Sequence, residues 1–180
     1  MSAEASIADL ARVRGRAELV AGEIRAIESA DASTASAELD VYASLREYAR
    51  ATRRGYAVTG RVAYVVDLPN RSSFSPDVSF VTGQPVGMGF LEGAPLFAAE
   101  VRLERERGVS ADRAVLEKVA DYFAAGTRAV WDVDVHASEV VRMCVRERPA
   151  QAVVFARGMV AHVDPALPGW VMPVEALFAR

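Results

Sequence analysis

Hydrophobic and polar residues follow two different periods along this chain of 180 residues. The pattern is organised around residues 94–101, Ala-Pro-Leu-Phe-Ala-Ala-Glu-Val, in which six of the eight residues are apolar and Pro95 marks the start. An apolar run of this length between chain-breaking residues predicts a strand covered on both faces. Glu100 is the exception, because a buried ionised carboxylate needs a metal, a cation or hydrogen bonds. The strand therefore either emerges into a cleft at Glu100 or provides Glu100 with a partner.

The other segments predict a mixture of helices and strands. Apolar residues recur at helical spacing in residues 37–54 and again from Ser110, a predicted N-cap, to Gly126, and we expect Gly55 to end the first helix. Two alternating runs in residues 18–27 flank Ala21-Gly22, which predicts a tight hairpin. The remaining segments predict a helix at 4–13 and a short helix at 174–178, with strands at 56–67, 76–81, 129–135, 139–146, 152–157 and 159–163. Between them we expect a loop or the approach to a helix at 29–36, a loop at 68–75, a mobile Gly/Pro-rich connector at 82–93 and a charged, solvated turn at 104–108.

Composition narrows the class of protein. A chain of this length with 52% hydrophobic residues predicts one folded domain over residues 1–180. The formal charge of −3 gives no overall basic field for nucleic acid, although a local basic patch remains compatible with it. Cys144 is the one cysteine, so no disulfide forms within the chain. No apolar run approaches the ~20 residues that span a bilayer, and the first residues lack the pattern of a signal peptide. We therefore expect a cytoplasmic protein without a membrane segment.

Several kinds of active site are not supported by the sequence. The glycines between residues 83 and 93 lack the Lys-Ser/Thr of a phosphate-binding loop. His136, His162 and Cys144 are too few for a typical zinc site. No Gly-x-Ser-x-Gly segment marks a serine hydrolase.

A set of charged residues remains. Asp77 precedes one strand, Glu100 lies near the end of the next, and Lys118 follows on a helix, four residues before Tyr122 and on the same helical face. Two carboxylates from neighbouring strands can bind Mg²⁺, and a nearby lysine can orient or deprotonate an attacking water or stabilise charge on a phosphodiester. A purely structural interpretation stays open, in which Asp77 caps a turn and Glu100 pairs with Lys118 or Arg102. Glu18, in the hairpin, is read from spacing alone as a solvent-facing edge position.

Four segments in this order, ELVAGEI, SPDVSFV, APLFAAEV and EKVADYFAAGTRAVWDVDVHASEVVRM, resemble the Uma-two family of endonucleases within the PD-(D/E)XK nuclease superfamily. The resemblance spans roughly residues 7–178. It implies a restriction-endonuclease-like α/β (α+β) fold, with a mixed β-sheet flanked by helices, an N-terminal β-hairpin and a long N-terminal helix. It also implies a Mg²⁺-dependent endonuclease that hydrolyses DNA and leaves a 5′-phosphate and a 3′-hydroxyl.

The resemblance assigns roles residue by residue. Asp77 and Glu100 match the metal ligands, and Glu18 and Lys118 complete the catalytic set. Tyr122 matches a tyrosine on the same helix as Lys118 and is predicted to contact the substrate. Arg102 departs from the family pattern, and we predict from its own chemistry that it contacts a phosphate of the substrate. Trp131 and Asp134 match a strand that we interpret as structural.

The chain departs from the family pattern after Val101, where Arg102-Leu-Glu-Arg replaces the usual Leu-Ser-Pro-Ser. Arg102 occupies the usual lysine position of the superfamily motif, and its pKa prevents it from acting as a base. The segment 32–38 also lacks the histidine common in the family. The alternative function is therefore a catalytically impaired member that binds nucleic acid or protein, and strand edges leave room for a homodimer.

Overall fold

The computed structural model describes residues 4–83, 89–106 and 108–178. Its elements, in chain order, are α1 (Ile7–Leu10), β1 (Ala17–Val20), β2 (Glu23–Ala26), α2 (Ala32–Thr52), β3 (Gly55–Thr59), β4 (Tyr64–Leu68), β5 (Arg71–Phe74), β6 (Val78–Thr82), β7 (Leu91–Glu92), β8 (Phe97–Val101), α3 (Val109–Ala125), β9 (Ala129–Val133), β10 (Val141–Val145), β11 (Val153–Phe155), β12 (Val160–His162), β13 (Val171–Pro173) and the 3₁₀ helix η1 (Val174–Phe178).

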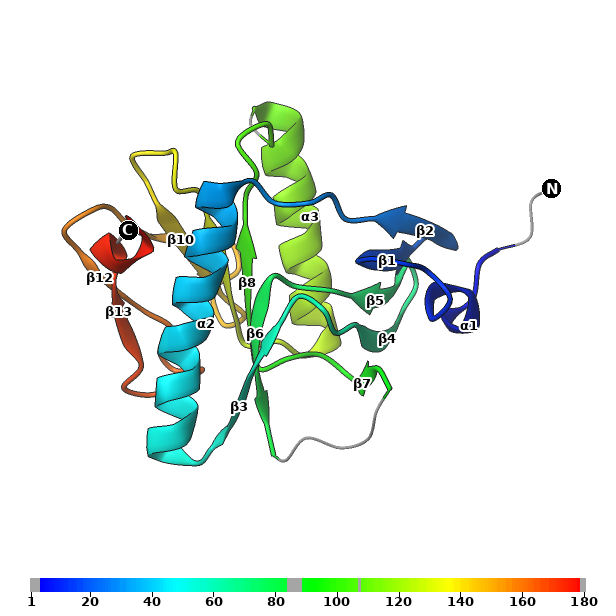
Figure 1. Cartoon of the computed structure of the whole chain (residues 1–180), viewed down its shortest axis with the longest axis horizontal. Helices are drawn as coiled ribbons and strands as arrows, with labels where there is room; N and C mark the ends of the chain where they lie inside the picture. The colour runs from blue at the N-terminus through cyan, green and yellow to red at the C-terminus, as the bar shows by residue number, and fades with distance from the viewer. Residues whose placement is uncertain (1–3, 84–88, 107, 179–180) are drawn as a thin grey trace.

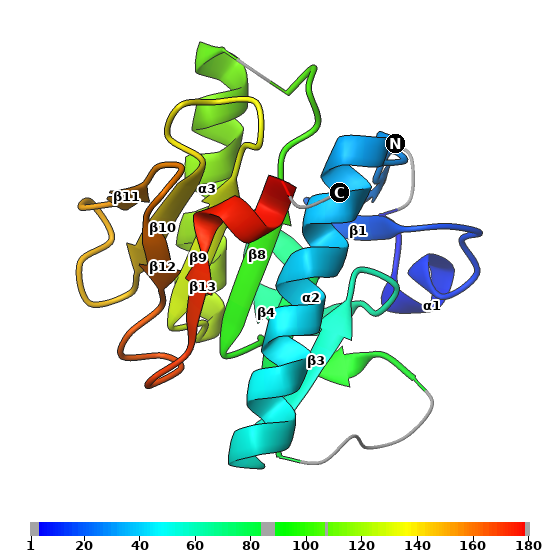
Figure 2. The ribbon, with the colours of Figure 1, turned by 60° about the vertical axis from the view of Figure 1, so that its left-hand side comes forward.

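A mixed sheet of six strands, the large sheet, forms the centre of the molecule in the order β11-β10-β9-β8-β6-β3. Strand β8 lies inside it, parallel to β9 and antiparallel to β6. Four of the five residues of β8 are buried, which confirms the strand covered on both faces that its apolar pattern predicts. Figure 2 shows α2 crossing one face of this sheet and α3 on the other.

The two-residue period of β8 divides its side chains between two cores. Phe97, Ala99 and Val101 belong to the main core beneath α2, whereas Ala98 belongs to a second core on the α3 side. Glu100 lies on the α3 side as well, where its carboxylate contacts α3. The strand therefore directs its one carboxylate away from the main core.

A second sheet, the small sheet, has the order β2-β1-β5-β4-β7 and lies beside α3, on the right of Figure 1. Its first two strands form the predicted hairpin, and Ala21 and Gly22 in the turn have φ values of 51° and 73°. Positive φ at both central residues is the geometry of the tight turns that join such strands. Together the two sheets, the long α2 and this hairpin confirm the predicted fold class.

The prediction of a loop at residues 68–75 is wrong, because residues 71–74 form β5. This strand pairs with β1 and β4 inside the small sheet. Its polar residues Arg71 and Ser73 are buried and make hydrogen bonds, so the strand carries no apolar alternation by which the sequence could reveal it.

The ends of α2 also differ from the prediction. The helix starts five residues earlier than expected, because the Asp31 side chain caps it by accepting from the amides of Ser33 and Thr34. Arg53, with φ 54°, closes the helix, whereas Gly55 belongs to β3. A Cβ at Gly55 would lie 2.0 Å from the carbonyl oxygen of Val81, so this glycine permits strand pairing rather than helix termination.

Smaller differences concern other elements. Helix α1 covers four residues instead of 4–13, and Gly108 rather than Ser110 is the N-cap of α3, without a side-chain cap. Strand β13 was not expected as a strand; it pairs with β12. Residues 84–88 of the predicted mobile connector and residue 107 of the predicted charged turn lie outside the described residues. Within the described ranges, no helix has the length and apolar character that crossing a membrane requires.

Candidate active site

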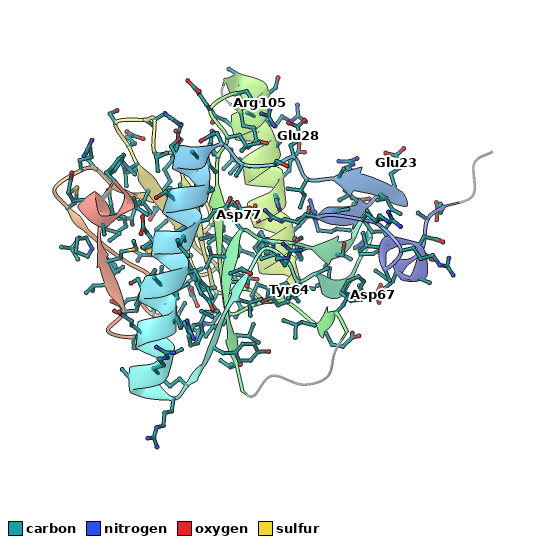
Figure 3. The ribbon with its side chains drawn as sticks, in the orientation of Figure 1. Glu23, Glu28, Tyr64, Asp67, Asp77 and Arg105 are labelled. Atoms are coloured by element: carbon teal, nitrogen blue, oxygen red, sulfur yellow. The ribbon has the colours of Figure 1, made fainter. Side chains whose placement is uncertain are left out.

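A cleft of about 1000 Å³ lies where the large sheet, the small sheet, α2 and α3 meet. Figure 3 labels Asp77 in this region, near the centre of the molecule. Arg105 and Glu28 lie higher in the same view and form an ion pair that joins the segment after β8 to the segment before α2. The predicted catalytic residues all line the cleft, namely Glu18, Asp77, Glu100 and Lys118.

The pairing of β6 with β8 brings Asp77 next to Glu100. Val78 is opposite Ala99 in the antiparallel register, so the residue before β6 faces the end of β8. The amide of Val101, the residue directly after Glu100, donates to Asp77 Oδ2 at 2.7 Å. Asp77 therefore accepts from the backbone beside Glu100, on the neighbouring strand, instead of capping a turn.

Helix α3 provides two partners for Glu100. Lys118 Nζ lies 2.9 Å from Glu100 Oε2, and the hydroxyl of Tyr122 donates to Glu100 Oε1 at 2.6 Å. Because the two residues are one helical turn apart, they approach the same carboxylate together. Lys118 also lies 2.9 Å from Glu18 Oε1, so its ammonium connects the two sheets.

Glu18 is buried, which contradicts the solvent-facing position read from spacing alone. Besides Lys118, its carboxylate accepts from the guanidinium of Arg71 at 2.7 Å and from the amide of Ser75 at 2.8 Å. Burial raises the pKa of Glu18, but Lys118, Arg71 and the Ser75 amide together lower it below its ordinary value. Glu18 is thus held as a carboxylate inside the molecule.

The environment affects Glu100 and Lys118 differently. Burial, with the nearby charges of Asp77 and Glu18, raises the pKa of Glu100 to about 7, although Lys118 opposes the shift. Burial lowers the pKa of Lys118, yet the two glutamates outweigh it and hold that pKa above its ordinary value. Lys118 is therefore an ammonium ion at neutral pH and a hydrogen-bond donor, not a base.

Tyr122 is fully buried and stacks on Phe74 with ring centroids 4.1 Å apart. Burial and the charge of Glu100 raise the pKa of its hydroxyl well above the ordinary value, so it remains a neutral donor. In this position Tyr122 orients Glu100, and the predicted contact with substrate would be indirect.

Arg102, the other predicted substrate contact, is engaged in ion pairs. Its guanidinium donates to both carboxylate oxygens of Asp132, at 2.6 and 2.7 Å, and to Asp112 at 2.6 Å. These bonds join the residue directly after β8 to β9 and α3. Glu100 accordingly pairs with Lys118 and not with Arg102, and a phosphate could engage Arg102 fully only by separating it from these carboxylates.

Several charged residues of the cleft were not identified from the sequence, and three of them act directly on the predicted catalytic residues. Arg16, in the segment before β1, lies 2.7 Å from Asp77 Oδ1; Arg71 binds Glu18 and Asp121; and Glu38 lines the cleft from α2. Burial and the charge of Asp77 raise the pKa of Glu38 to about 7. Arg16 lies two residues before the ELVAGEI segment, so its position near the hairpin could have pointed to it. No local sequence pattern distinguishes Arg71 or Glu38 from other charged residues of the chain.

The donor set fits a divalent cation by charge. When all of them are ionised, the connected cluster holds five carboxylates and three cations, a surplus of two negative charges that is complete only above the pKa of about 7 of Glu38 and Glu100. Its members are Glu18, Glu38, Asp77, Glu100, Asp121, Arg16, Arg71 and Lys118. One Mg²⁺ would neutralise this surplus, and oxygen ligands suit it. Across the described ranges, however, no three Asp, Glu, His or Cys side chains are already arranged as a metal-binding group. Asp77 and Glu100 could supply two ligands once their present cationic partners move.

Comparisons with known proteins agree with this architecture. The profile of a family described as Uma2, "Putative restriction endonuclease", matches residues 7–175. A crystal structure of a putative nuclease belonging to DUF820 from Anabaena variabilis ATCC 29413 is similar, with a TM-score of 0.76, 15% sequence identity and 97% of each chain covered. That likeness establishes a shared fold. No curated protein sequence matches the chain.

Proposed function

Since this chain belongs to the Uma2 family of putative restriction endonucleases, we propose that it is an endonuclease that hydrolyses DNA phosphodiester bonds with Mg²⁺ bound at Asp77 and Glu100. The observation that carries the proposal is the convergence of these two carboxylates at the paired ends of β6 and β8, with Lys118 on the same carboxylate as Tyr122.

In this proposal a bound Mg²⁺ supplies Lewis acidity toward a phosphate oxygen and lowers the pKa of a bound water. Asp77 and Glu100 would hold the cation with their carboxylates. Tyr122 fixes the orientation of Glu100 through its 2.6 Å hydrogen bond, and the Val101 amide does the same for Asp77 at 2.7 Å. Besides its cationic partner, each ligand therefore has a neighbour without net charge that would still orient it once the cation is bound.

Lys118 has the role of a cation that its second partner, Glu18, would keep in the cleft once a metal takes its place on Glu100. Its ammonium lies between Glu100 and Glu18, where it can donate to the attacking water or to a phosphate oxygen that gains charge. Glu18 keeps Lys118 in place and remains ionised because Arg71 also binds it. Lys118 cannot act as the general base, because its raised pKa keeps it protonated. A carboxylate or a water molecule therefore accepts the proton of the attacking water.

One observation favours a second function, a family member that binds nucleic acid without cutting it. Each predicted metal ligand already has a cationic partner, Arg16 on Asp77 and Lys118 on Glu100. A protein that keeps these ion pairs in the presence of Mg²⁺ would bind DNA in a salt-sensitive way and leave it intact.

A cleavage assay separates the two functions. Plasmid and single-stranded DNA are incubated with the protein and Mg²⁺ or Mn²⁺, with EDTA in a parallel sample. We expect metal-dependent cleavage that falls by about 10²-fold or more in Asp77→Asn, Glu100→Gln and Lys118→Met. Glu117→Gln is the matched control, because Glu117 adjoins Lys118 but pairs with Arg113 on the exposed face of α3. Absence of cleavage with either metal, or cleavage unchanged in Glu100→Gln, would contradict the proposal.

A further inference from the structure

Arg16 occupies the oxygen of Asp77 that a metal would need. Asp77 Oδ2 accepts from the Val101 amide at 2.7 Å, so that oxygen already takes part in the hydrogen bonding between β6 and β8. Arg16 Nη1 lies 2.7 Å from the other oxygen, Oδ1. A divalent cation and the guanidinium therefore compete for the same carboxylate oxygen.

The fold provides a place for this guanidinium but satisfies it incompletely. Arg16 Nη2 donates to the carbonyl of Ser75 at 2.7 Å, and a Cβ at Gly60 would lie 2.5 Å from Arg16 Cζ. Only glycine at position 60 leaves room for the guanidinium. Arg16 Nε, however, is buried and lacks a hydrogen-bond partner among the described residues. A buried donor without a partner weakens this position relative to a fully bonded one.

Glu38 offers a second position for the guanidinium. It lines the same cleft from α2, and its charge acts on both Arg16 and Asp77. Across the part of the chain that the structure describes, the Glu38 carboxylate makes no hydrogen bond or ion pair. A carboxylate in this state is available to accept Arg16.

We propose that Arg16 neutralises Asp77 in the metal-free protein and transfers its guanidinium to Glu38 when a divalent cation binds Asp77. The inference rests on the proposed function, because it requires a cation at Asp77. Arg16 is then a positioning residue: it prevents repulsion between the clustered carboxylates before the cation binds, and afterwards it neutralises Glu38. In this exchange the positive charge of Arg16 stays inside the cleft, and Asp77 Oδ1 becomes free to bind the cation.

Calorimetric titration with Mn²⁺, in the absence of DNA, tests the exchange. Arg16→Met removes the competing ion pair and is expected to bind Mn²⁺ about 10-fold more tightly than the wild type. Arg25→Met is the matched control, since Arg25 lines the cleft and its side chain is 60% exposed. It removes the same charge without a contact to Asp77, so its affinity should stay within about 2-fold of the wild type.

Glu38→Gln distinguishes exchange from simple attraction of the cation. If Glu38 receives Arg16, its replacement weakens Mn²⁺ binding about 5-fold in the wild type and has almost no effect in Arg16→Met. Equal weakening in both backgrounds would mean that Glu38 acts on the cation directly, and the transfer to Glu38 would be wrong. Unchanged or weaker Mn²⁺ binding in Arg16→Met would overturn the competition itself.

Thermal unfolding covers the case in which Arg16→Met is unstable. Mn²⁺ should raise the melting temperature of this variant more than that of the wild type, because the cation replaces the lost partner of Asp77. An equal or smaller rise would contradict the exchange. The cleavage assay tests the proposed function separately. If the wild type binds Mn²⁺ but does not cleave DNA, the proposed function is refuted, and the affinity of Arg16→Met for Mn²⁺ still decides whether the exchange occurs. If neither the wild type nor Arg16→Met binds Mn²⁺, both proposals are refuted.

Discussion

The two sheets of this molecule contribute in opposite ways to one cleft. The large sheet supplies Asp77 and Glu100, two carboxylates where β6 begins and β8 ends, beside the apolar main core. The small sheet and the segment before it supply Glu18, Arg16 and Arg71, in which cations outnumber the carboxylate. One sheet therefore brings surplus negative charge and the other most of the charge that balances it.

The difference teaches how a stable core and a charged site can share one fold. Apolar packing stabilises the large sheet, so this sheet can accommodate a partly buried carboxylate where β8 ends. The small sheet has a smaller apolar cluster and is joined to the site through ion pairs. We expect stability to depend mainly on the first sheet and the state of the site mainly on the second.

The largest expected effect tests the contrast in packing. Phe97→Ala in the large sheet should lower the free energy of unfolding by about 4 kcal/mol, because Phe97 is fully buried against Trp131 and Trp170. Leu19→Ala in the small sheet should cost about 2 kcal/mol, since its cluster is smaller and nearer the surface. Urea denaturation measures both, and an equal or reversed order would break the comparison.

The next largest effect on stability is expected from replacing Arg102. Arg102→Met leaves the buried Asp132 carboxylate without its partner and should lower the free energy of unfolding by about 3 kcal/mol. Asp132→Asn in the same chain removes that charge, so the double variant should recover most of the loss. A single variant as stable as the wild type, but with weaker DNA binding, would instead support the phosphate contact predicted from the sequence.

Much of the fold and part of the site follow from the sequence. The hairpin, the buried β8 and the order Asp77, Glu100, Lys118 were predicted, because each leaves a local pattern or carries the family resemblance. Strand β5 was missed, since its buried polar residues hide the alternation of a strand. Arg71 and Glu38 reach the cleft only through tertiary pairing, which neither spacing nor helical period reports.

A smaller effect compares two buried tyrosines. Tyr122→Phe removes a hydrogen bond to the Glu100 carboxylate, whereas Tyr64→Phe removes one between two neutral hydroxyls, Tyr64 and Ser79. Above pH 8, where Glu100 is ionised, we expect costs of about 2 and about 1 kcal/mol, because bonds to charged groups are stronger. Equal costs in urea denaturation would argue that Tyr122 does not hold an ionised Glu100.

The smallest effect depends on pH. Burial and Asp77 raise the pKa of Glu38 in the folded protein to about 7, so between its ordinary value and pH 7 the folded state binds more protons than the unfolded state. The free energy of unfolding therefore falls as pH rises through this window. Glu38→Gln should gain about 1 kcal/mol at pH 8.5 and almost nothing at pH 4. The matched control Glu47→Gln, on the exposed side of α2, should show no such dependence.

The central claim is that the edge of the large sheet forms a divalent-cation site. Anomalous diffraction at the manganese edge, from crystals grown with Mn²⁺, tests it most directly. We expect a peak about 2.1–2.3 Å from one oxygen each of Asp77 and Glu100, with the Arg16 guanidinium displaced from Asp77. No peak at these carboxylates under saturating Mn²⁺, with the Arg16–Asp77 ion pair intact, would contradict it.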